Sequence, residues 1–196
     1  EKLSELEELI LNDMQEGDLL VLSGSVPDGV SDQVYADWIT RAKQSQVKTV
    51  LDADGPLFEN GIKAGPTLIK PNNHELSAYF ARSLADREDI INSAEKLFEY
   101  GVQMIMVSLG SDGAIFLTEE DRIMIESLVL EVKSTVGAGD AMVGALTLGM
   151  EKGLSHEEMA VLSAAASSAS LLNNGTEMGS KEQIMKLKNQ VKYYYL

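Results

Sequence analysis

The sequence contains no cysteine, and this absence removes two classes of structure at once. Without thiols the chain cannot form disulfide bonds or thiolate metal sites. Lack of cysteine fits a reducing compartment, so we expect a cytoplasmic location. The sequence also lacks any apolar run that approaches the length of a transmembrane helix, and no signal peptide is visible. No membrane partner is therefore expected.

Positively charged side chains are also scarce. The 16 lysine and arginine residues are outnumbered by 31 aspartate and glutamate residues, which gives a formal net charge of −15. A chain this acidic repels the phosphate backbone of nucleic acids and the surface of anionic membranes. We therefore expect neither nucleic acid nor a membrane as a partner.

The chain does have a regular alternation of short apolar runs and segments with helical spacing of apolar residues. Its 196 residues, 44% of them apolar, are enough for one domain with a substantial core, and we expect a single domain over 1–196. The alternation predicts an α/β fold with a mostly parallel sheet and helices on both faces. Helices are predicted at 2–14, 32–46, 56–64, 86–100, 139–152, 155–172 and 180–189. Strands are predicted at 19–22, in KTVLDADG (48–55), in TLIKP with its end at Lys70-Pro71, and in QMIMVSLG (103–110). A hairpin is predicted from GAIFLT and RIMIES, and a final strand or tail in YYYL.

Polar residues and glycines follow four of the predicted strands, where each strand ends. Because ligands of such sheets bind at the carboxyl ends of the strands, these residues indicate a site. The alternative is that strand ends need turn residues in any case, which explains each segment taken singly but the combination less well. The four segments are Ser23-Gly24-Ser25, Asp52-Ala53-Asp54, Lys70-Pro71-Asn72 and Ser108-Leu109-Gly110.

Two glycines and an acid lie around the start of the helix predicted at 139–152, with the acid in its first turn. Gly137 and Gly139 allow backbone conformations with positive φ and close approach of a ligand. The free N–H groups at the start of the helix form a ready site for a phosphate group. Asp140 could take a proton from an attacking hydroxyl, or it could simply be a helix-capping acid. The loop matches neither the P-loop nor the dinucleotide-binding fingerprint.

Several motifs, taken together, resemble those of the PfkB (ribokinase-like) family of sugar kinases. They occur in the family's order over residues 19–176, and they favour the branch that acts on phosphorylated ketohexoses. The resemblance implies a three-layer α/β/α ribokinase-like (Rossmann-like) fold and transfer of the γ-phosphoryl group of ATP, with Mg²⁺, to a sugar-phosphate hydroxyl. Fructose 1-phosphate is favoured as the acceptor, and fructose 6-phosphate and tagatose 6-phosphate are the alternative acceptors. The alternative to a kinase is a nucleotide-binding module without catalytic activity. The motifs are STVGAGDAMVGAL, LIKPNNHEL, SLGSDGA, LSGSVPDGV and LLNNGT.

The resemblance also implies roles for individual residues. Asp140 would be the catalytic base, and Ser25 would touch the sugar phosphate. Glu75 and Asp52 would organise Mg²⁺ through water, since this ion keeps several of its waters. The anion hole would be formed by Gly137, Ala138 and Gly139, and the nucleotide would be bound by Lys70, Asn72, Ser108, Gly110, Gly113 and Asn173. A homodimer is expected for the intact protein.

Five of these residues also have purely structural explanations. Asn72 and Glu75 have the spacing of a capping box, and Ser25 could serve the turn before Pro27. Lys70 could be solvated, and Asn173 could cap the end of a helix.

The resemblance covers only part of a complete family member. Such a member has further residues before the helix at 2–14, which carry the first strands of the sheet, a small β lid and the segment that grips the sugar. None of these is in the sequence, which begins with Glu1 and not Met. We therefore expect residues 1–196 to hold the nucleotide-binding and catalytic part, and to bind nucleotide weakly when isolated.

Overall fold

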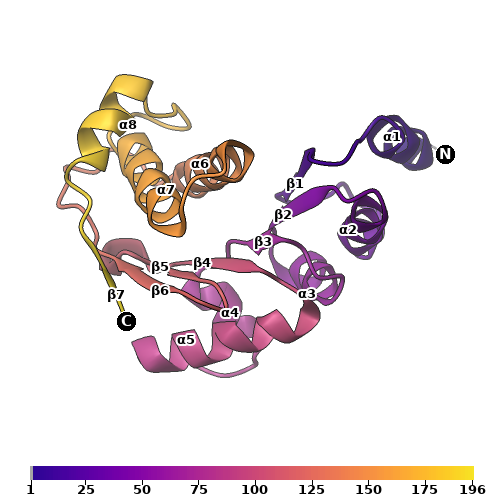
Figure 1. Ribbon diagram of the computed structural model, residues 1–196, viewed down its shortest axis with the longest axis horizontal. Helices are drawn as coiled ribbons and strands as arrows, with labels where there is room; N and C mark the ends of the chain where they lie inside the picture. Colours follow the sequence, from indigo (N-terminus) through magenta and orange to yellow (C-terminus); the bar gives the residue numbers. More distant parts are fainter. Residues whose placement is uncertain (1) are drawn as a thin grey trace. The chain divides into compact units, whose positions relative to one another are not determined.

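A computed structural model describes residues 2–196, which form two compact units that meet between Ile105 and Met106 in the sequence (Figure 1). The boundary falls within one strand, and each unit is described in turn. The first unit contains α1 (Lys2–Leu11), β1 (Leu19–Ser23), α2 (Val34–Gln44), β2 (Lys48–Asp52), α3 (Gly55–Lys63), β3 (Leu68–Ile69), α4 (Asn73–Tyr79), α5 (Arg87–Glu95) and the 3-10 helix η1 (Lys96–Tyr100). Strand β4 (Met104–Ser108) begins in this unit and ends in the second.

The strands of the first unit are parallel. β1 pairs with β2 from Leu19↔Lys48 to Ser23↔Asp52, β2 pairs with β3, and β3 pairs with the start of β4. This register brings the carboxyl ends of β1, β2 and β3 to one edge, because parallel strands all end on the same side. The polar residues that follow these strands are therefore neighbours.

Helices α2 and α3 pack on each other and on β2 (Figure 1). The contact between α3 and β2 depends on a glycine, because a Cβ atom at Gly61 would lie 2.7 Å from Leu51 Cδ2. Ile39, Leu51 and Ile62 are completely buried in this layer. Burial of such side chains contributes about 1.5–3 kcal/mol each to folding, which makes the layer a rigid support for the strand ends.

The second unit combines an antiparallel sheet with a group of three helices. β5 pairs with β6, and β6 pairs with the final strand, both antiparallel. Helices α6 and α7 lie side by side, with α8 against α7 (Figure 1). A Cβ atom at Gly149 would lie 2.7 Å from Met159 Cγ, so the glycine allows the close approach of α6 and α7. The elements are the 3-10 helix η2 (Gly110–Asp112), β5 (Ala114–Leu117), β6 (Arg122–Ile125), α6 (Ala138–Lys152), α7 (His156–Leu171), α8 (Lys181–Lys188) and β7 (Tyr193–Tyr195).

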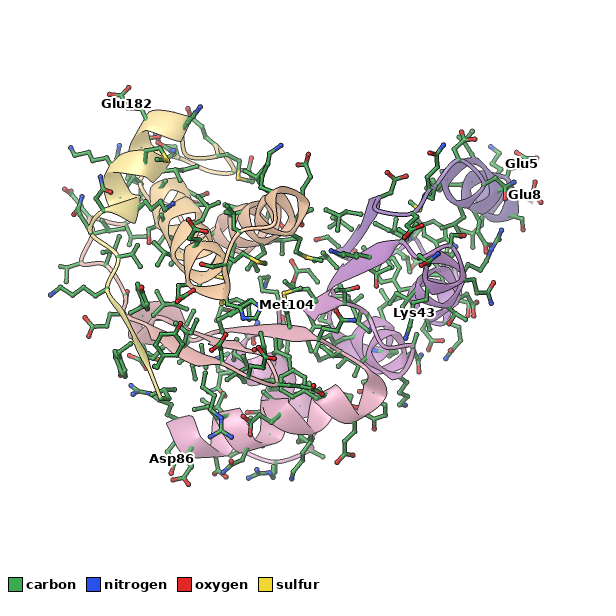
Figure 2. All side chains as sticks on the ribbon, viewed as in Figure 1. Glu5, Glu8, Lys43, Asp86, Met104 and Glu182 are labelled. Atoms are coloured by element: carbon green, nitrogen blue, oxygen red, sulfur yellow. The ribbon has the colours of Figure 1, made fainter. Side chains whose placement is uncertain are left out.

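Exposed helix faces carry much of the acidic charge. Glu5 and Glu8 project from α1, Asp86 lies at the start of α5 and Glu182 at the start of α8 (Figure 2). Acids near helix starts, such as Asp86 and Glu182, also interact favourably with the helix dipole. None of the helices described in residues 2–196 is long and apolar enough to cross a bilayer.

The predicted α/β pattern is confirmed, and the main differences lie at element ends. The helix predicted at 2–14 ends at Leu11, and the one predicted at 86–100 is α5 followed by the 3-10 helix η1, which ends at Gly101 with φ +88°. The hairpin and the terminal strand are both present. The single domain over 1–196 stays a prediction.

One side chain is less exposed than its polar neighbours in sequence suggest. His156 is half-buried: its Nδ1 atom lies 2.6 Å from Asp121 Oδ2, and its ring packs against Phe116. The contact joins the first residue of α7 to the loop between β5 and β6.

Candidate functional site

A buried ion pair lies at the strand ends of the first unit. Lys70 Nζ is 3.0 Å from Asp52 Oδ1, and only 6% of Lys70 is exposed. The two residues follow the paired positions Leu51 and Ile69 of β2 and β3, which is why they meet. Burial of the lysine requires such a partner, because an unpaired buried charge is strongly destabilising. The solvated alternative for Lys70 is therefore wrong.

Asn72 and Glu75 form the capping box that their spacing predicts. The Glu75 amide donates to Asn72 Oδ1 (2.9 Å), and the Asn72 amide donates to Glu75 Oε2 (2.8 Å). Asn72 Nδ2 also donates to Glu75 Oε1 (2.7 Å). Burial raises the pKa of Glu75, with the carboxylates of Asp52 and Asp54 adding to the effect, while the Asn72 hydrogen bond and Lys70 oppose it. The capping box thus holds the Glu75 carboxylate at a position where it interacts electrostatically with Lys70 and Asp52.

These carboxylates fit a water-mediated role toward Mg²⁺ better than direct coordination. Both oxygens of Glu75 accept hydrogen bonds from Asn72, and Asp52 pairs with Lys70. Among residues 2–196 there is no group of three or more acidic or histidine side chains arranged to hold a metal ion. Mg²⁺ keeps several waters and uses few carboxylates, so a pair of already bonded acids can contact it through those waters.

Ser25 lies in an exposed turn at the end of β1. Gly24, just before it, has φ +83°, and its amide donates to the Asp52 carbonyl oxygen (2.8 Å). The next turn is closed by a hydrogen bond from the Val30 amide to the Pro27 carbonyl (3.1 Å), with Gly29 at φ +86°. The glycine conformations hold this segment in place, and Ser25 is solvent-exposed within it.

A cavity of about 670 Å³ lies within the second unit. Its volume is in the range of small-molecule and cofactor sites. Its wall includes five residues of the predicted site, which are Ser108, Gly110, Gly113, Ala138 and Gly139. The structure therefore brings the turn after β4 and the start of α6 together around one space.

The glycine-acid loop forms the start of α6. Gly137 is the residue before the helix and has φ +83°, a conformation that glycine adopts without strain. Asp140 lies in the first turn of the helix and is exposed. Two hydrogen bonds hold the chain that leads into the loop. The Lys133 amide donates to the carbonyl of Leu171, the last residue of α7 (2.8 Å), and Ser134 Oγ donates to the Gly175 carbonyl beyond it (2.9 Å). The free N–H groups of this first turn are thereby held in a defined position.

Asn173 does not line the cavity. Its Nδ2 atom donates to the carbonyls of Ala169 (3.3 Å) and Met178 (3.2 Å), and its Oδ1 atom accepts from Gln183 Nε2 (3.3 Å). These bonds hold the turn after α7 against α8. The structure thus shows a local structural role for Asn173, close to the helix-end alternative.

Two parts of the cavity wall were missed from the sequence. The first is the irregular segment after β6, and the second is one face of α7. The only sequence signal for the second is the run of small residues SAAASSAS, which leaves room beside the helix. The first part consists of Glu126, Ser127, Leu128, Val129, Leu130 and Val132, and the second of Ala164, Ser167, Ser168 and Leu171.

Comparison with known proteins gives consistent matches. The family model described as pfkB family carbohydrate kinase matches residues 1–183. The 1-phosphofructokinase of Haemophilus influenzae is 40% identical over 151 residues, which are 76% of this chain and 48% of the relative. The ATP-dependent 6-phosphofructokinase isozyme 2 of Escherichia coli is 36% identical over 185 residues, 93% of this chain and 60% of the relative.

The comparison with solved structures points to the same kind of protein. Phosphofructokinase-2 from Escherichia coli in complex with potassium matches with a TM-score of 0.91 and 34% identity, over 96% of this chain and 61% of that one. The chain thus spans about half to three-fifths of the length of these relatives. It belongs to the pfkB family of carbohydrate kinases and has the ribokinase-like α/β fold of that family.

Proposed function

We propose that the protein is an ATP-dependent kinase that transfers the γ-phosphoryl group to a hydroxyl of a ketohexose phosphate. The observation that carries this proposal is the cavity at the glycine-containing start of α6, with an exposed acid in the first turn of the same helix. Membership of the carbohydrate kinase family supports it.

The start of α6 supplies two parts of the chemistry. Its free N–H groups, at Gly137, Ala138 and Gly139, would stabilise the negative charge that develops on the transferring phosphoryl group. Asp140 would accept the proton of the attacking hydroxyl as a general base. The positive end of the helix dipole favours a phosphate at this place.

The strand ends of the first unit would supply the remaining groups. Lys70 would interact with nucleotide phosphates, and Asn72, Glu75 and Asp52 would hold the waters of Mg²⁺. The ion would neutralise charge on the phosphates when bound. Ser108, Gly110 and Gly113 would contact the nucleotide from the cavity wall, and Asn173 would act indirectly, through the turn after α7.

The favoured acceptor is fructose 1-phosphate, which makes the activity that of a 1-phosphofructokinase. The support is the 40% identity to the Haemophilus influenzae 1-phosphofructokinase over 151 residues. The 36% identity to the Escherichia coli 6-phosphofructokinase isozyme, over 185 residues, supports fructose 6-phosphate in the same way. Fructose 6-phosphate and tagatose 6-phosphate are the alternative acceptors. A homodimer, measurable by light scattering, and a cytoplasmic location are part of the proposal.

The test is an assay of ADP release with ATP, Mg²⁺ and each of the three ketohexose phosphates, on the protein at its natural length. Asp140→Asn should lower kcat by roughly 10²–10⁴-fold while the Kd for ATP is retained. Asp37→Asn is the matched control, because Asp37 is also an exposed acid in the first turn of a helix, α2. It should leave kcat unchanged. ATP binding without turnover on any of the three would instead favour a non-catalytic nucleotide-binding module.

A further inference from the structure

The segment Ser23–Ser25 is held by a tyrosine from the following helix. Tyr35, the second residue of α2, places its Oη atom 3.2 Å from the Ser23 carbonyl oxygen and 3.3 Å from the Gly24 carbonyl oxygen. A phenol has one hydrogen to donate, so the two carbonyls share it. The hydroxyl therefore bridges the two peptide groups that come directly before Ser25.

Packing and hydrogen bonding both hold the Tyr35 side chain in this position. Only 7% of Tyr35 is exposed, so its ring is fixed by packing within the first unit. Burial raises the pKa of Tyr35, so the hydroxyl keeps its proton and remains a donor at neutral pH. A buried hydroxyl needs a partner, and these two carbonyls provide it.

The same segment is held from its other side by β2. The Gly24 amide donates to the Asp52 carbonyl oxygen (2.8 Å), and the side chain of Asp52 pairs with Lys70. Gly24 takes φ +83°, which turns the chain between its two attachments. Ser25 is thus the first residue beyond a peptide unit fixed by both α2 and β2.

We propose that Tyr35 is a positioning residue for the acceptor substrate, acting through the carbonyls of Ser23 and Gly24 to fix Ser25. The inference rests on the proposed function, in which Ser25 touches the sugar phosphate. Tyr35 itself contacts backbone, so its effect is on the acceptor and not on the nucleotide.

The kinetic test compares Tyr35→Phe with Tyr79→Phe in the protein at its natural length. Phenylalanine keeps the packed ring and removes only the hydroxyl. For Tyr35→Phe, KM for the ketohexose phosphate should rise by roughly 3- to 10-fold, as expected for one lost hydrogen bond, while KM for ATP is unchanged. Tyr79→Phe is the control, because Tyr79 is in the same unit and its hydroxyl bonds to Tyr100. It should leave both KM values unchanged.

A second measurement separates this inference from the proposed function. Hydrogen exchange of a peptide over 19–33 should be faster in Tyr35→Phe than in the parent protein, whether or not a ketohexose phosphate is turned over. If the parent protein turns over none of the three acceptors, the proposed function fails, and with it the acceptor role. Equal exchange in both proteins, or equal rises in both KM values, would overturn the positioning role itself.

Discussion

Replacement of Gly113 by alanine provides a strong test of the cavity geometry. Gly113 has φ +95° and ψ −136°, a conformation that is essentially restricted to glycine. A Cβ atom there would lie 2.0 Å from the Ile125 carbonyl oxygen and 3.0 Å from the Ser127 amide nitrogen. Both are backbone atoms, so no side-chain rotation can relieve the contact. The turn after β4 must then move away from the chain that leaves β6.

The expected cost combines backbone strain with this steric contact. The unfavourable conformation alone costs about 1–3 kcal/mol. The displaced backbone adds to it, so we expect a total loss of at least about 3 kcal/mol in the free energy of unfolding. For a chain of this size, 1 kcal/mol corresponds to roughly 2–4 °C in Tm, so Tm should fall by about 6–12 °C.

The assay is thermal unfolding followed by circular dichroism, with Gly144→Ala as the matched control. Gly144 lies inside α6, and a Cβ atom there has nothing within 4 Å beyond its own helix. Alanine at this position should stabilise the chain by about 0.5–1 kcal/mol. The two substitutions are chemically identical but should change Tm in opposite directions. An unchanged Tm for Gly113→Ala would refute the close approach of the two segments.

Three further predictions follow from local features. The pKa of Glu75 is raised in the folded chain above its ordinary value of 4.5. Protonated Glu75 therefore stabilises the fold at pH values below 4.5, and this stabilisation is lost as the pH rises through the folded pKa. Glu75→Gln should remove this pH dependence of the free energy of unfolding, measured in urea between pH 4 and 7. Ser155→Ala should lower the free energy of unfolding by about 1 kcal/mol in urea melts, because Ser155 is the N-cap of α7. Peroxide should weaken ATP binding, measured by calorimetry, by oxidising the exposed Met178, whose methyl group packs beside Gly137. Met178→Leu should protect, whereas Met185→Leu, at an equally exposed methionine, should not.

Local signals in the sequence predicted local structure well. The spacing of Asn72 and Glu75 predicts a capping box, which the hydrogen bonds confirm, because both partners lie within one helical turn. The helix predicted at 86–100 does end at residue 100, before Gly101, which takes a positive φ. Such features depend only on a few consecutive residues, so a short stretch of sequence is enough to predict them.

Contacts between distant residues were harder to predict. The sequence left open whether Lys70 is solvated, and the parallel register of β2 and β3 decides that it pairs with Asp52. His156 has polar neighbours along the chain, but Asp121, 35 residues away, holds it against the hairpin. Neither pairing can be predicted from a short stretch of sequence, because the two partners are far apart along the chain.

The parts of the cavity wall that belong to sequence motifs could be predicted from the sequence. The parts that depend on tertiary packing could not. The turn at Gly110 and the start of α6 were identified from their residues, and both line the cavity. The segment Glu126–Leu130 and the face of α7 with Ser167 became visible only in three dimensions. An irregular segment has no periodicity by which its inward side could be recognised.

The small residues of α6 and α7 have a consequence for the thermodynamics of ligand binding. Ala138 and Gly139 on one helix, and Ala164, Ser167 and Ser168 on the other, give this part of the cavity wall almost no rotatable side-chain bonds. Long side chains lose conformational entropy when a ligand orders them, at a cost of about 0.5–1.5 kcal/mol each. The alanine, glycine and serine residues have almost nothing to order when the ligand arrives. On these two helices the entropic cost of fixing the wall therefore falls on Met142 and Leu171.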